Sequence, residues 1–375
     1  MAKLGEIATY INGYAFKPQD WSDEGIPIIR IQDLTGNSYQ ANRYNGEYAS
    51  KYEVNDGDVL ISWSASLGVY IWHGEKAVLN QHIFKVVFDK ERISKDFFVH
   101  QVGLILENAA SDAHGATMKH LTKPVFDALP FYLPPYEKQC EIAEVLNKVT
   151  SLISLRKQQL AKLDELVKAR FVEMFGEPVS NPMGWEKKKL QDVCYKLTDG
   201  THFSPESYDE GDYKYITAKN IKSDGFDFSN ITYVPESVHR TIYERCNPEL
   251  GDVLYIKDGA TTGIAMVNSL EEEFSLLSSV ALLKQNRKVI DGRFLCGVLN
   301  NAEMYKSIRS NMGGAAITRL TIAKLQKIMV IVPPLPLQKQ FATFVKRVDQ
   351  QKQTVQQSLE KLELMKKALM QEYFG

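Results

Sequence analysis

The sequence predicts an α+β protein that contains two β-rich domains and two long helices, and the helices are expected to pair as an antiparallel coiled coil. The first observation is a repeat: a double proline and a long amphipathic segment close each half, at Pro134-Pro135 and at Pro333-Pro334. The two copies lie 199 residues apart. A period this long indicates a duplicated domain rather than a solenoid, so the chain should have approximate two-fold symmetry.

The second observation is the change of pattern inside each half. β-rich stretches over residues 1–133 and 178–332 are each followed by a helical segment, over 134–177 and 333–375. We therefore expect two domains, each joined to one helical spacer.

The β-rich stretches contain paired strand signals. Ile26–Ile31 and Tyr213–Thr217 are short apolar runs followed by polar turns. A Gly-Asp pair precedes a second strand in each half, at Gly57-Asp58 and Gly251-Asp252. Each of these strands leads into a loop of small residues, where a backbone can approach a ligand closely.

The helical segments have the heptad spacing of a coiled-coil seam. Charged residues interrupt the seam at Arg156 and Arg170 in one helix and at Lys352 and Lys366 in the other, and these interruptions do not coincide under the repeat. Pairing between the two helices is therefore favoured over self-pairing. The predicted interface is Ile142, Leu146, Val149, Ile153, Leu160, Leu163, Val345, Val348, Val355, Leu359, Leu362 and Leu369.

The composition indicates a soluble globular protein with room for two cores. The chain has 375 residues, 44% hydrophobic and 24% charged, and no apolar run long enough to span a membrane. Its four cysteines are widely spaced, match no zinc pattern and suggest a reducing, cytoplasmic compartment. The formal net charge of −1 counts against an independent DNA-binding module. It fits a subunit whose partners supply part of the positive surface.

Motifs of several enzyme classes are missing from the sequence. There is no phosphate-binding loop and no Gly-x-Gly-x-x-Gly, and the histidines have no spacing suited to a metal. Leu133-Pro134-Pro135-Tyr136 is similar to the catalytic Pro-Pro-Tyr loop of amino-methyltransferases, but Leu133 cannot hold a target amine. We interpret both double prolines as helix starts. No catalytic residue, metal site or cofactor of its own is expected.

Four features together resemble one family. They are the paired organisation, Leu4-Gly5-Glu6-Ile7-Ala8, the motif Thr198-Asp199-Gly200-Thr201-His202, and the helix starts, Leu-Pro-Pro…Gln…Ile-Ala in the first copy and Val-Pro-Pro…Gln…Phe-Ala in the second. The chain resembles the DNA-specificity (S) subunits of type I restriction–modification systems. This resemblance implies two target-recognition domains that read a split site on double-stranded DNA. It also implies two methyltransferase subunits on the coiled coil, with restriction subunits joining them. S-adenosylmethionine, ATP and Mg²⁺ would then belong to those partners.

Within this interpretation, the expected DNA contacts are polar or basic residues in loops at strand ends. In the first domain they are Arg30, Gln32, Ser64, Gln81, His82, Lys119 and His120. In the second domain they are Thr201, His202, Lys219, Asn220, Lys257, Thr261, Thr262 and Arg319.

Two other functions stay open at this point. One is a coiled-coil scaffold that binds only protein, and the other is a stand-alone DNA methyltransferase. A footprint on duplex DNA in the presence of a partner methyltransferase would separate all three.

Overall fold

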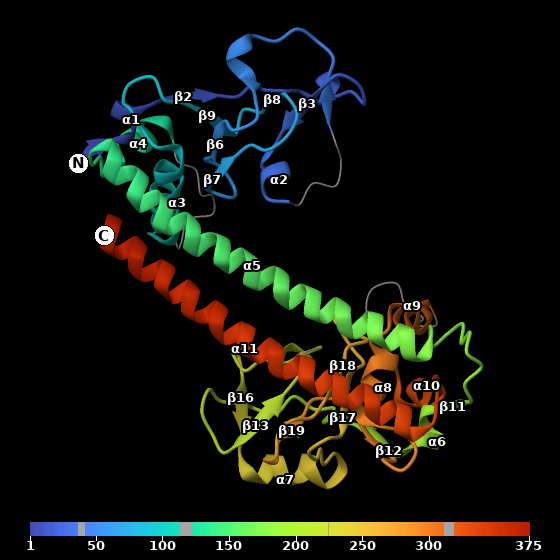
Figure 1. Cartoon of the computed structure of the whole chain (residues 1–375). Helices are drawn as coiled ribbons and strands as arrows, with labels where there is room; N and C mark the ends of the chain where they lie inside the picture. Colours follow the sequence, from blue (N-terminus) through green and yellow to red (C-terminus); the bar gives the residue numbers. More distant parts are fainter. Residues whose placement is uncertain (37–41, 113–121, 224, 311–318) are drawn as a thin grey trace. The chain divides into compact units, whose positions relative to one another are not determined.

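The computed structural model describes residues 1–36, 42–112, 122–223, 225–310 and 319–375. The chain forms two compact units: the first contains Met1–Arg156 with Ser358–Gly375, and the second contains Lys157–Gln357. The long helices α5 (Tyr136–Phe175) and α11 (Leu335–Phe374) each contribute to both units (Figure 1). The predicted α+β class is confirmed.

The first unit is built on two sheets. One has the strand order β2-β9-β6-β7 and the other β4-β3-β8-β5, while β1 and β10 form a separate pair. The strands are β1 (Ala2–Lys3), β2 (Thr9–Asn12), β3 (Ile26–Ile29), β4 (Arg43–Tyr44), β5 (Glu53–Val54), β6 (Val59–Ser62), β7 (Gly68–Ile71), β8 (Ala77–Leu79), β9 (Ile83–Val87) and β10 (Pro130–Phe131). The short helices are α1 (Leu4–Ile7), η1 (Pro18–Asp20), α2 (Ile31–Leu34), η2 (Ser50–Tyr52), α3 (Lys95–Asp112) and α4 (Lys123–Asp127).

The second unit repeats this plan. Its sheets have the orders β12-β20-β17-β18 and β16-β13-β19, with the pairs β11-β21 and β14-β15 beside them. The strands are β11 (Lys187–Lys189), β12 (Cys194–Asp199), β13 (Tyr213–Ile216), β14 (Ile221–Lys222), β15 (Gly225–Phe226), β16 (Thr232–Val234), β17 (Val253–Ile256), β18 (Ala265–Val267), β19 (Ser275–Leu276), β20 (Val280–Gln285) and β21 (Met329–Ile331). The helices are α6 (Leu190–Val193), η3 (Ala218–Asn220), α7 (Glu236–Arg245), α8 (Gly292–Leu299), α9 (Ala302–Ser310) and α10 (Ile322–Gln326).

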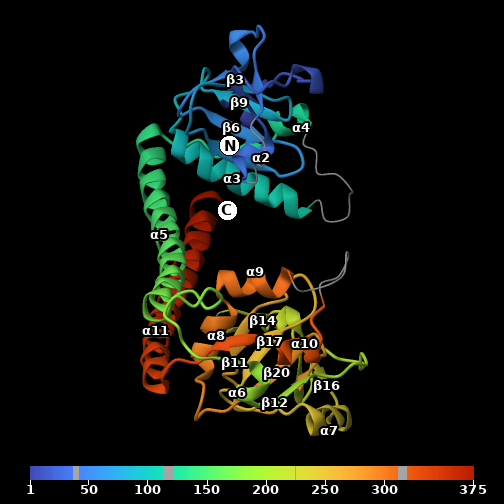
Figure 2. The same ribbon diagram turned by 90° about the vertical axis from the view of Figure 1, so that its right-hand side faces the viewer.

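In both units the four-stranded antiparallel sheet separates two cores. Alternate residues of a strand point to opposite faces. Val253 and Tyr255 of β17 pack toward α8 and the long helices, whereas Leu254 and Ile256 pack toward the second sheet. In the first unit, Ile61 of β6 likewise joins the core beneath α3. Figure 2 shows α3 and α8 beside their own sheets.

The repeated Gly-Asp pair forms the same turn in both units. Gly57 and Gly251 have positive φ angles of 80° and 86°, which favour glycine. The aspartate that follows also pairs with a lysine of the central strand: Lys85 Nζ lies 2.8 Å from Asp58 Oδ2, and the equivalent pair in the second unit, from Lys284 to Asp252, is 3.1 Å. The turn is thereby fixed to the middle of its sheet.

The repeated double proline introduces a buried glutamine that fixes each long helix to its domain. Gln139 Nε2 donates to the Pro134 carbonyl at 2.9 Å, while its Oε1 accepts from the Ser94 amide at 3.0 Å. Gln338 Nε2 donates to the Pro333 carbonyl at 2.7 Å, while its Oε1 accepts from the Asp291 amide at 2.8 Å. The motif therefore joins the helix start to the start of α3 or α8.

The long helices run antiparallel within each unit. In the first, Ile142 and Leu146 near the start of α5 share a core with Met370 near the end of α11. In the second, Phe171 near the end of α5 meets Phe341 near the start of α11, with ring centroids 5.5 Å apart. The predicted seam residues are all buried or half-buried.

Two of the charged interruptions bond across the helix pair. Arg156 Nε donates to Ser358 Oγ at 3.2 Å in the first unit. Lys352 Nζ lies 2.7 Å from Asp164 Oδ1 in the second unit. Each cation therefore has a polar partner on the other helix. Within the described part of the chain, no helix has the length and apolar character needed to cross a membrane.

Candidate DNA interface

One edge of the second unit's main sheet brings together residues that are far apart in the sequence. Strands β12 and β17 flank β20, and both are antiparallel to it. They therefore run parallel to each other and end at the same edge of the sheet. Asp199 is the last residue of β12, and Lys257 follows the last residue of β17 directly.

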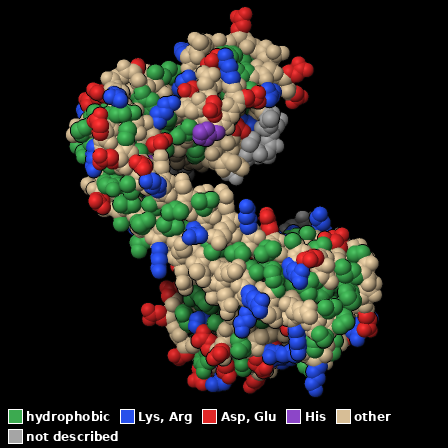
Figure 3. Space-filling view, in the orientation of Figure 1, with side chains coloured by type: hydrophobic (Ala, Val, Ile, Leu, Met, Phe, Trp, Pro, Cys, Tyr) green, Lys and Arg blue, Asp and Glu red, His purple; other side chains and the backbone are tan. Residues whose placement is uncertain are grey.

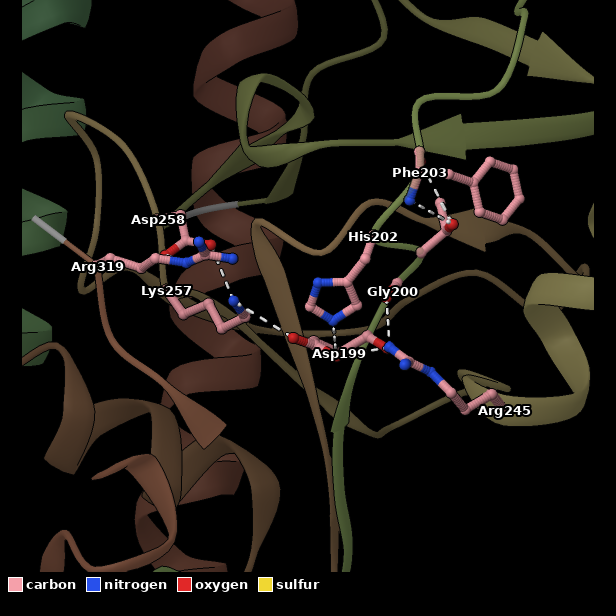
Figure 4. Close-up of polar contacts among 9 residues, drawn as sticks. Asp199, Gly200, His202, Phe203, Arg245, Lys257, Asp258 and Arg319 are labelled. Carbon is pink, nitrogen blue, oxygen red and sulfur yellow. Dashed lines mark hydrogen bonds and ion pairs between the residues drawn. The ribbon is translucent and has the colours of Figure 1, made fainter. Parts of the chain in front are cut away.

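Asp199 is buried and holds two cationic side chains and a histidine at this edge (Figure 4). Its carboxylate lies 2.7 Å from Arg245 Nη2, 3.1 Å from His202 Nε2 and 3.3 Å from Lys257 Nζ. Arg245 Nη2 also donates to the carbonyl of Gly200 at 2.6 Å. Arg245 comes from the end of α7, so this helix delivers a cation to the ends of the sheet strands.

A second carboxylate extends the group. Asp258 Oδ2 lies 2.8 Å from Lys257 Nζ, and Asp258 Oδ1 lies 3.5 Å from Arg319 Nε. We call these residues, Asp199, His202, Arg245, Lys257, Asp258 and Arg319, the Asp199 cluster. It has three permanent cations and a histidine against two carboxylates, so the edge is locally positive although the whole chain is not.

The backbone turns sharply after β12 to present the cluster. The Gly200 amide donates to the Val280 carbonyl at 3.3 Å, and the Thr201 amide donates to the Leu276 carbonyl at 2.7 Å. A side chain on Gly200 would collide with the carbonyl of Leu276, so this position requires glycine. The chain thereby passes from one sheet to the other, and the His202 side chain is left exposed.

The first unit has the same edge with different chemistry. Asn12 ends β2 and Trp63 follows β6, and both strands flank β9 as β12 and β17 flank β20. Gly13 follows Asn12 as Gly200 follows Asp199, and a side chain there would also collide with a carbonyl, that of Asn80. Asn12 and Trp63 therefore occupy the places of Asp199 and Lys257.

A hydrogen bond and ring contacts connect the residues at this first edge. Trp63 Nε1 donates to Asn12 Oδ1 at 3.2 Å. The indole stacks on Phe84 with centroids 5.7 Å apart and meets His82 at 5.6 Å. Gln81 Nε2 lies 3.3 Å from His82 Nε2. The first edge is thus built from amides, an indole and an imidazole.

The predicted contact residues of the second domain divide into exposed and buried groups. His202, Lys219, Thr261 and Arg319 are exposed. The buried group supports the loops: Asn220 Oδ1 accepts from the Thr217 amide, and Thr262 Oγ1 donates to the Gly259 carbonyl. The buried residues are Thr201, Asn220, Lys257 and Thr262.

The predicted residues of the first domain divide in a similar way. His82 is exposed, Arg30, Gln32 and Gln81 are half-buried, and Ser64 is buried. Arg30 precedes α2, where its amide donates to Asp33 Oδ2 at 2.8 Å. Lys119 and His120 lie outside the described residues.

Among the residues at these edges, the predicted contacts did not include Asp199, Arg245, Asp258, Asn12 and Trp63. Asp199 and Arg245 are 46 positions apart in the sequence, and Asn12 and Trp63 are 51 apart. Asp199 had a signal, because it lies in the Thr-Asp-Gly-Thr-His motif. The sequence held no such signal for Arg245 or Trp63, because only the folded positions of α7 and of the strands bring them to the edges.

Comparison with known proteins identifies the family. A family profile described as the type I restriction modification DNA specificity domain matches residues 1–165 and 182–364. The chain belongs to the type I restriction–modification specificity subunits. The two matched segments each contain one edge described above, so the duplication seen in the sequence is a duplication of the specificity domain.

Two curated specificity subunits match this chain over most of its length. The specificity subunit of the EcoBI type I restriction enzyme of Escherichia coli is 23% identical, over 92% of this chain and 78% of the relative. That of the MjaVIII enzyme of Methanocaldococcus jannaschii is 22% identical, over 99% and 90%. The crystal structure of an S subunit from M. genitalium has the same fold, with a TM-score of 0.60 at 16% identity, over 100% of this chain and 95% of that one.

Proposed function

We propose that this specificity subunit reads a bipartite site on double-stranded DNA, one half-site for each β-rich domain, over residues 1–133 and 178–332. One observation carries the proposal: the same sheet edge occurs twice with different side chains. In the second domain the edge is the Asp199 cluster, and in the first it is Asn12 with Trp63. Two copies of one scaffold with different chemistry suit two different half-sites.

The exposed members of the predicted set are the proposed direct contacts. His202, Lys219, Thr261 and Arg319 would serve in the second domain, and His82 with Gln81, Arg30 and Gln32 in the first. Imidazole, amide and guanidinium groups reach base edges and phosphates. The buried Ser64, Thr201, Asn220, Lys257 and Thr262 support these loops in this proposal. Lys119 and His120 stay proposed contacts on sequence grounds alone.

The subunit would position its partners through the paired helices, over 134–177 and 333–375. Several apolar side chains of these helices are exposed, including Leu155 at 58% and Leu364 at 69%. Figure 3 shows hydrophobic side chains along the visible face of the helices. Exposed apolar residues of this kind are typical of a protein–protein interface. We propose that two methyltransferase subunits dock here and that restriction subunits join them.

Catalysis in this proposal belongs to the partners, which would bind S-adenosylmethionine, ATP and Mg²⁺. Over the described residues, no group of three or more His, Cys, Asp or Glu side chains is arranged to hold a metal ion. The Asp199 cluster pairs each carboxylate with a cation, which suits support of a basic surface rather than metal binding.

The test is reconstitution with the methyltransferase subunit. The assembled complex should protect two separated segments of a duplex in a footprint and methylate one bipartite sequence. The subunit alone should bind DNA weakly, because a near-neutral chain releases few counterions. Methyl transfer by the subunit alone would contradict the proposal, and so would a complex that protects only one continuous segment.

A further inference from the structure

The first domain has a candidate base-contact site at Asn12, a residue that neither the sequence motifs nor the family match singles out. Asn12 is exposed at the end of β2, at the edge that corresponds to the Asp199 cluster. Among the described residues its side-chain amide is held through Oδ1, which accepts from Trp63 Nε1 at 3.2 Å. Fixing the oxygen in this way directs the two amide N–H donors away from the indole.

Trp63 is anchored well enough to act as this fixed donor. Its ring is half-buried and stacks on the buried Phe84 with an interplanar angle of 26°. The backbone amide of Trp63 donates to the carbonyl of His82 at 3.4 Å, which ties the residue after β6 to the loop before β9. A donor that is held by packing and by backbone contacts orients its partner without a large entropy loss on binding.

The chemistry of the pair suits the edge of a base pair better than a phosphate. An asparagine amide offers donors and an acceptor at fixed spacing, which matches the major-groove edge of adenine. None of Asn12, Trp63, Gln81 and His82 carries a permanent charge, unlike the arginines and lysine of the Asp199 cluster. A contact of this kind discriminates between bases and contributes little counterion release.

We infer that Asn12 contacts a base of the first half-site and that Trp63 is its positioning residue. The inference rests on the proposed function and goes further: it names the reading residue of the first domain. It also states that the contact is neutral, whereas the equivalent place in the second domain is ionic.

The experiment uses the subunit assembled with its methyltransferase partner and duplexes in which each base pair of the site is changed in turn. Asn12→Ala should lower methylation of the intact site about tenfold to hundredfold, the effect of one lost base contact. It should also abolish discrimination at one or two adjacent positions of the first half-site. The second half-site, which reports folding and assembly, should keep its discrimination at every position.

Three further measurements make the result specific. Trp63→Phe keeps a packed ring but removes the N–H donor, so it should weaken discrimination at the same position and add nothing in the Asn12→Ala background. The fold-change caused by Asn12→Ala should be equal at low and high salt. Asn45→Ala, a change of another exposed asparagine of this unit, should behave as wild type.

Two results would count against these ideas, and they are distinct. Unchanged discrimination throughout the first half-site in Asn12→Ala would overturn the inference while the proposed function stands. A wild-type complex with no preference at either half-site would overturn the proposed function itself.

Discussion

Asp199 contacts Arg245, His202 and Lys257 at the edge of its sheet, and this environment shows why it should be intolerant of change. The side chain is buried among Arg245, His202 and Lys257, and Lys257 is itself almost fully buried. A buried ammonium such as that of Lys257 keeps its desolvation cost without full compensation when it loses a counter-charge.

We expect Asp199→Asn to destabilise the second unit by about 1.5–3 kcal/mol, the usual value of hydrogen bonds to charged groups. Arg245 and His202 should also lose their fixed positions, so discrimination at the second half-site should fall while the first is unaffected. Denaturant unfolding and site-resolved methylation measure the two effects. Asp209→Asn is the matched control because Asp209 is exposed in the same unit. Equal unfolding curves for the two variants would contradict this prediction.

His100 gives the first unit a stability that depends on pH. Its Nε2 lies 2.7 Å from Asn147 Oδ1, at the contact between α3 and α5. Burial lowers the pKa of His100 below its ordinary value of 6.5, and the positive charge of Lys366 lowers this pKa further, although the hydrogen bond to Asn147 opposes the shift. The folded state therefore favours the neutral imidazole more than the unfolded state does.

Stability should consequently fall on acidification, because the unfolded chain takes up a proton on His100 below its ordinary pKa before the folded chain does. The contribution is complete above the ordinary value of 6.5 and is lost as the pH falls through the interval beneath it. His100→Gln keeps a hydrogen-bonding group but removes the titration, so the free energy of unfolding should decline less between about pH 7.5 and 5.5. The exposed His73→Gln is the control, and a decline as steep as in wild type would argue against this role of His100.

At the scale of elements, each double-proline motif connects the start of a long helix to the start of α3 or α8. The glutamine that follows each double proline satisfies backbone groups that would otherwise be buried without partners. Gln338→Leu should destabilise the second unit by roughly 1–3 kcal/mol, because the Asp291 amide and the Pro333 carbonyl lose their partner. Gln340→Leu, two residues further along and exposed, should have little effect on thermal unfolding. A similar loss in both variants would show that the buried glutamine has no special role.

The seam between α5 and α11 allows a second prediction at this scale. Leu359 is buried in the first unit, and Leu160 is half-buried in the second. Changing both to Asp places unpaired charges in apolar surroundings, so thermal unfolding should shift strongly downward and solution scattering should change. The exposed Leu364→Asp should leave the isolated subunit folded and instead weaken binding of the methyltransferase partner. A double variant that unfolds like wild type would contradict the seam.

The elements were more predictable than the edge residues, for a physical reason. Heptad spacing and the double prolines are local signals, so the two long helices could be predicted from neighbouring residues. Lys257 was predicted as a contact because it follows a strand, yet its ammonium is buried between two carboxylates. Arg245 could not be predicted because α7 reaches the end of β12 only in the folded unit. Local pattern predicts which loops meet at an edge, but not which of their side chains remain exposed.

At the scale of the whole molecule, the proposed bipartite reading makes a prediction about spacing. Adding one heptad to α5 after Arg156 and one to α11 after Gln357 lengthens each helix by about 10 Å while the seam remains in register. Both insertions lie at the boundary between the two compact units. The spacer between half-sites should grow by about three base pairs, and the half-sites themselves should stay the same. Methylome sequencing of the reconstituted system measures this, and a change in a half-site sequence would contradict independent reading.

The division of the chain into units also determines the order in which the two units can be completed during synthesis. The second unit is one continuous segment, Lys157–Gln357, whereas the first contains both Met1–Arg156 and Ser358–Gly375. Met370, Leu369 and Phe374 belong to or pack against the core of the first unit, so that core cannot close before they leave the exit tunnel. The domain that is synthesised first is therefore completed last, because its core waits for the C-terminal part of α11.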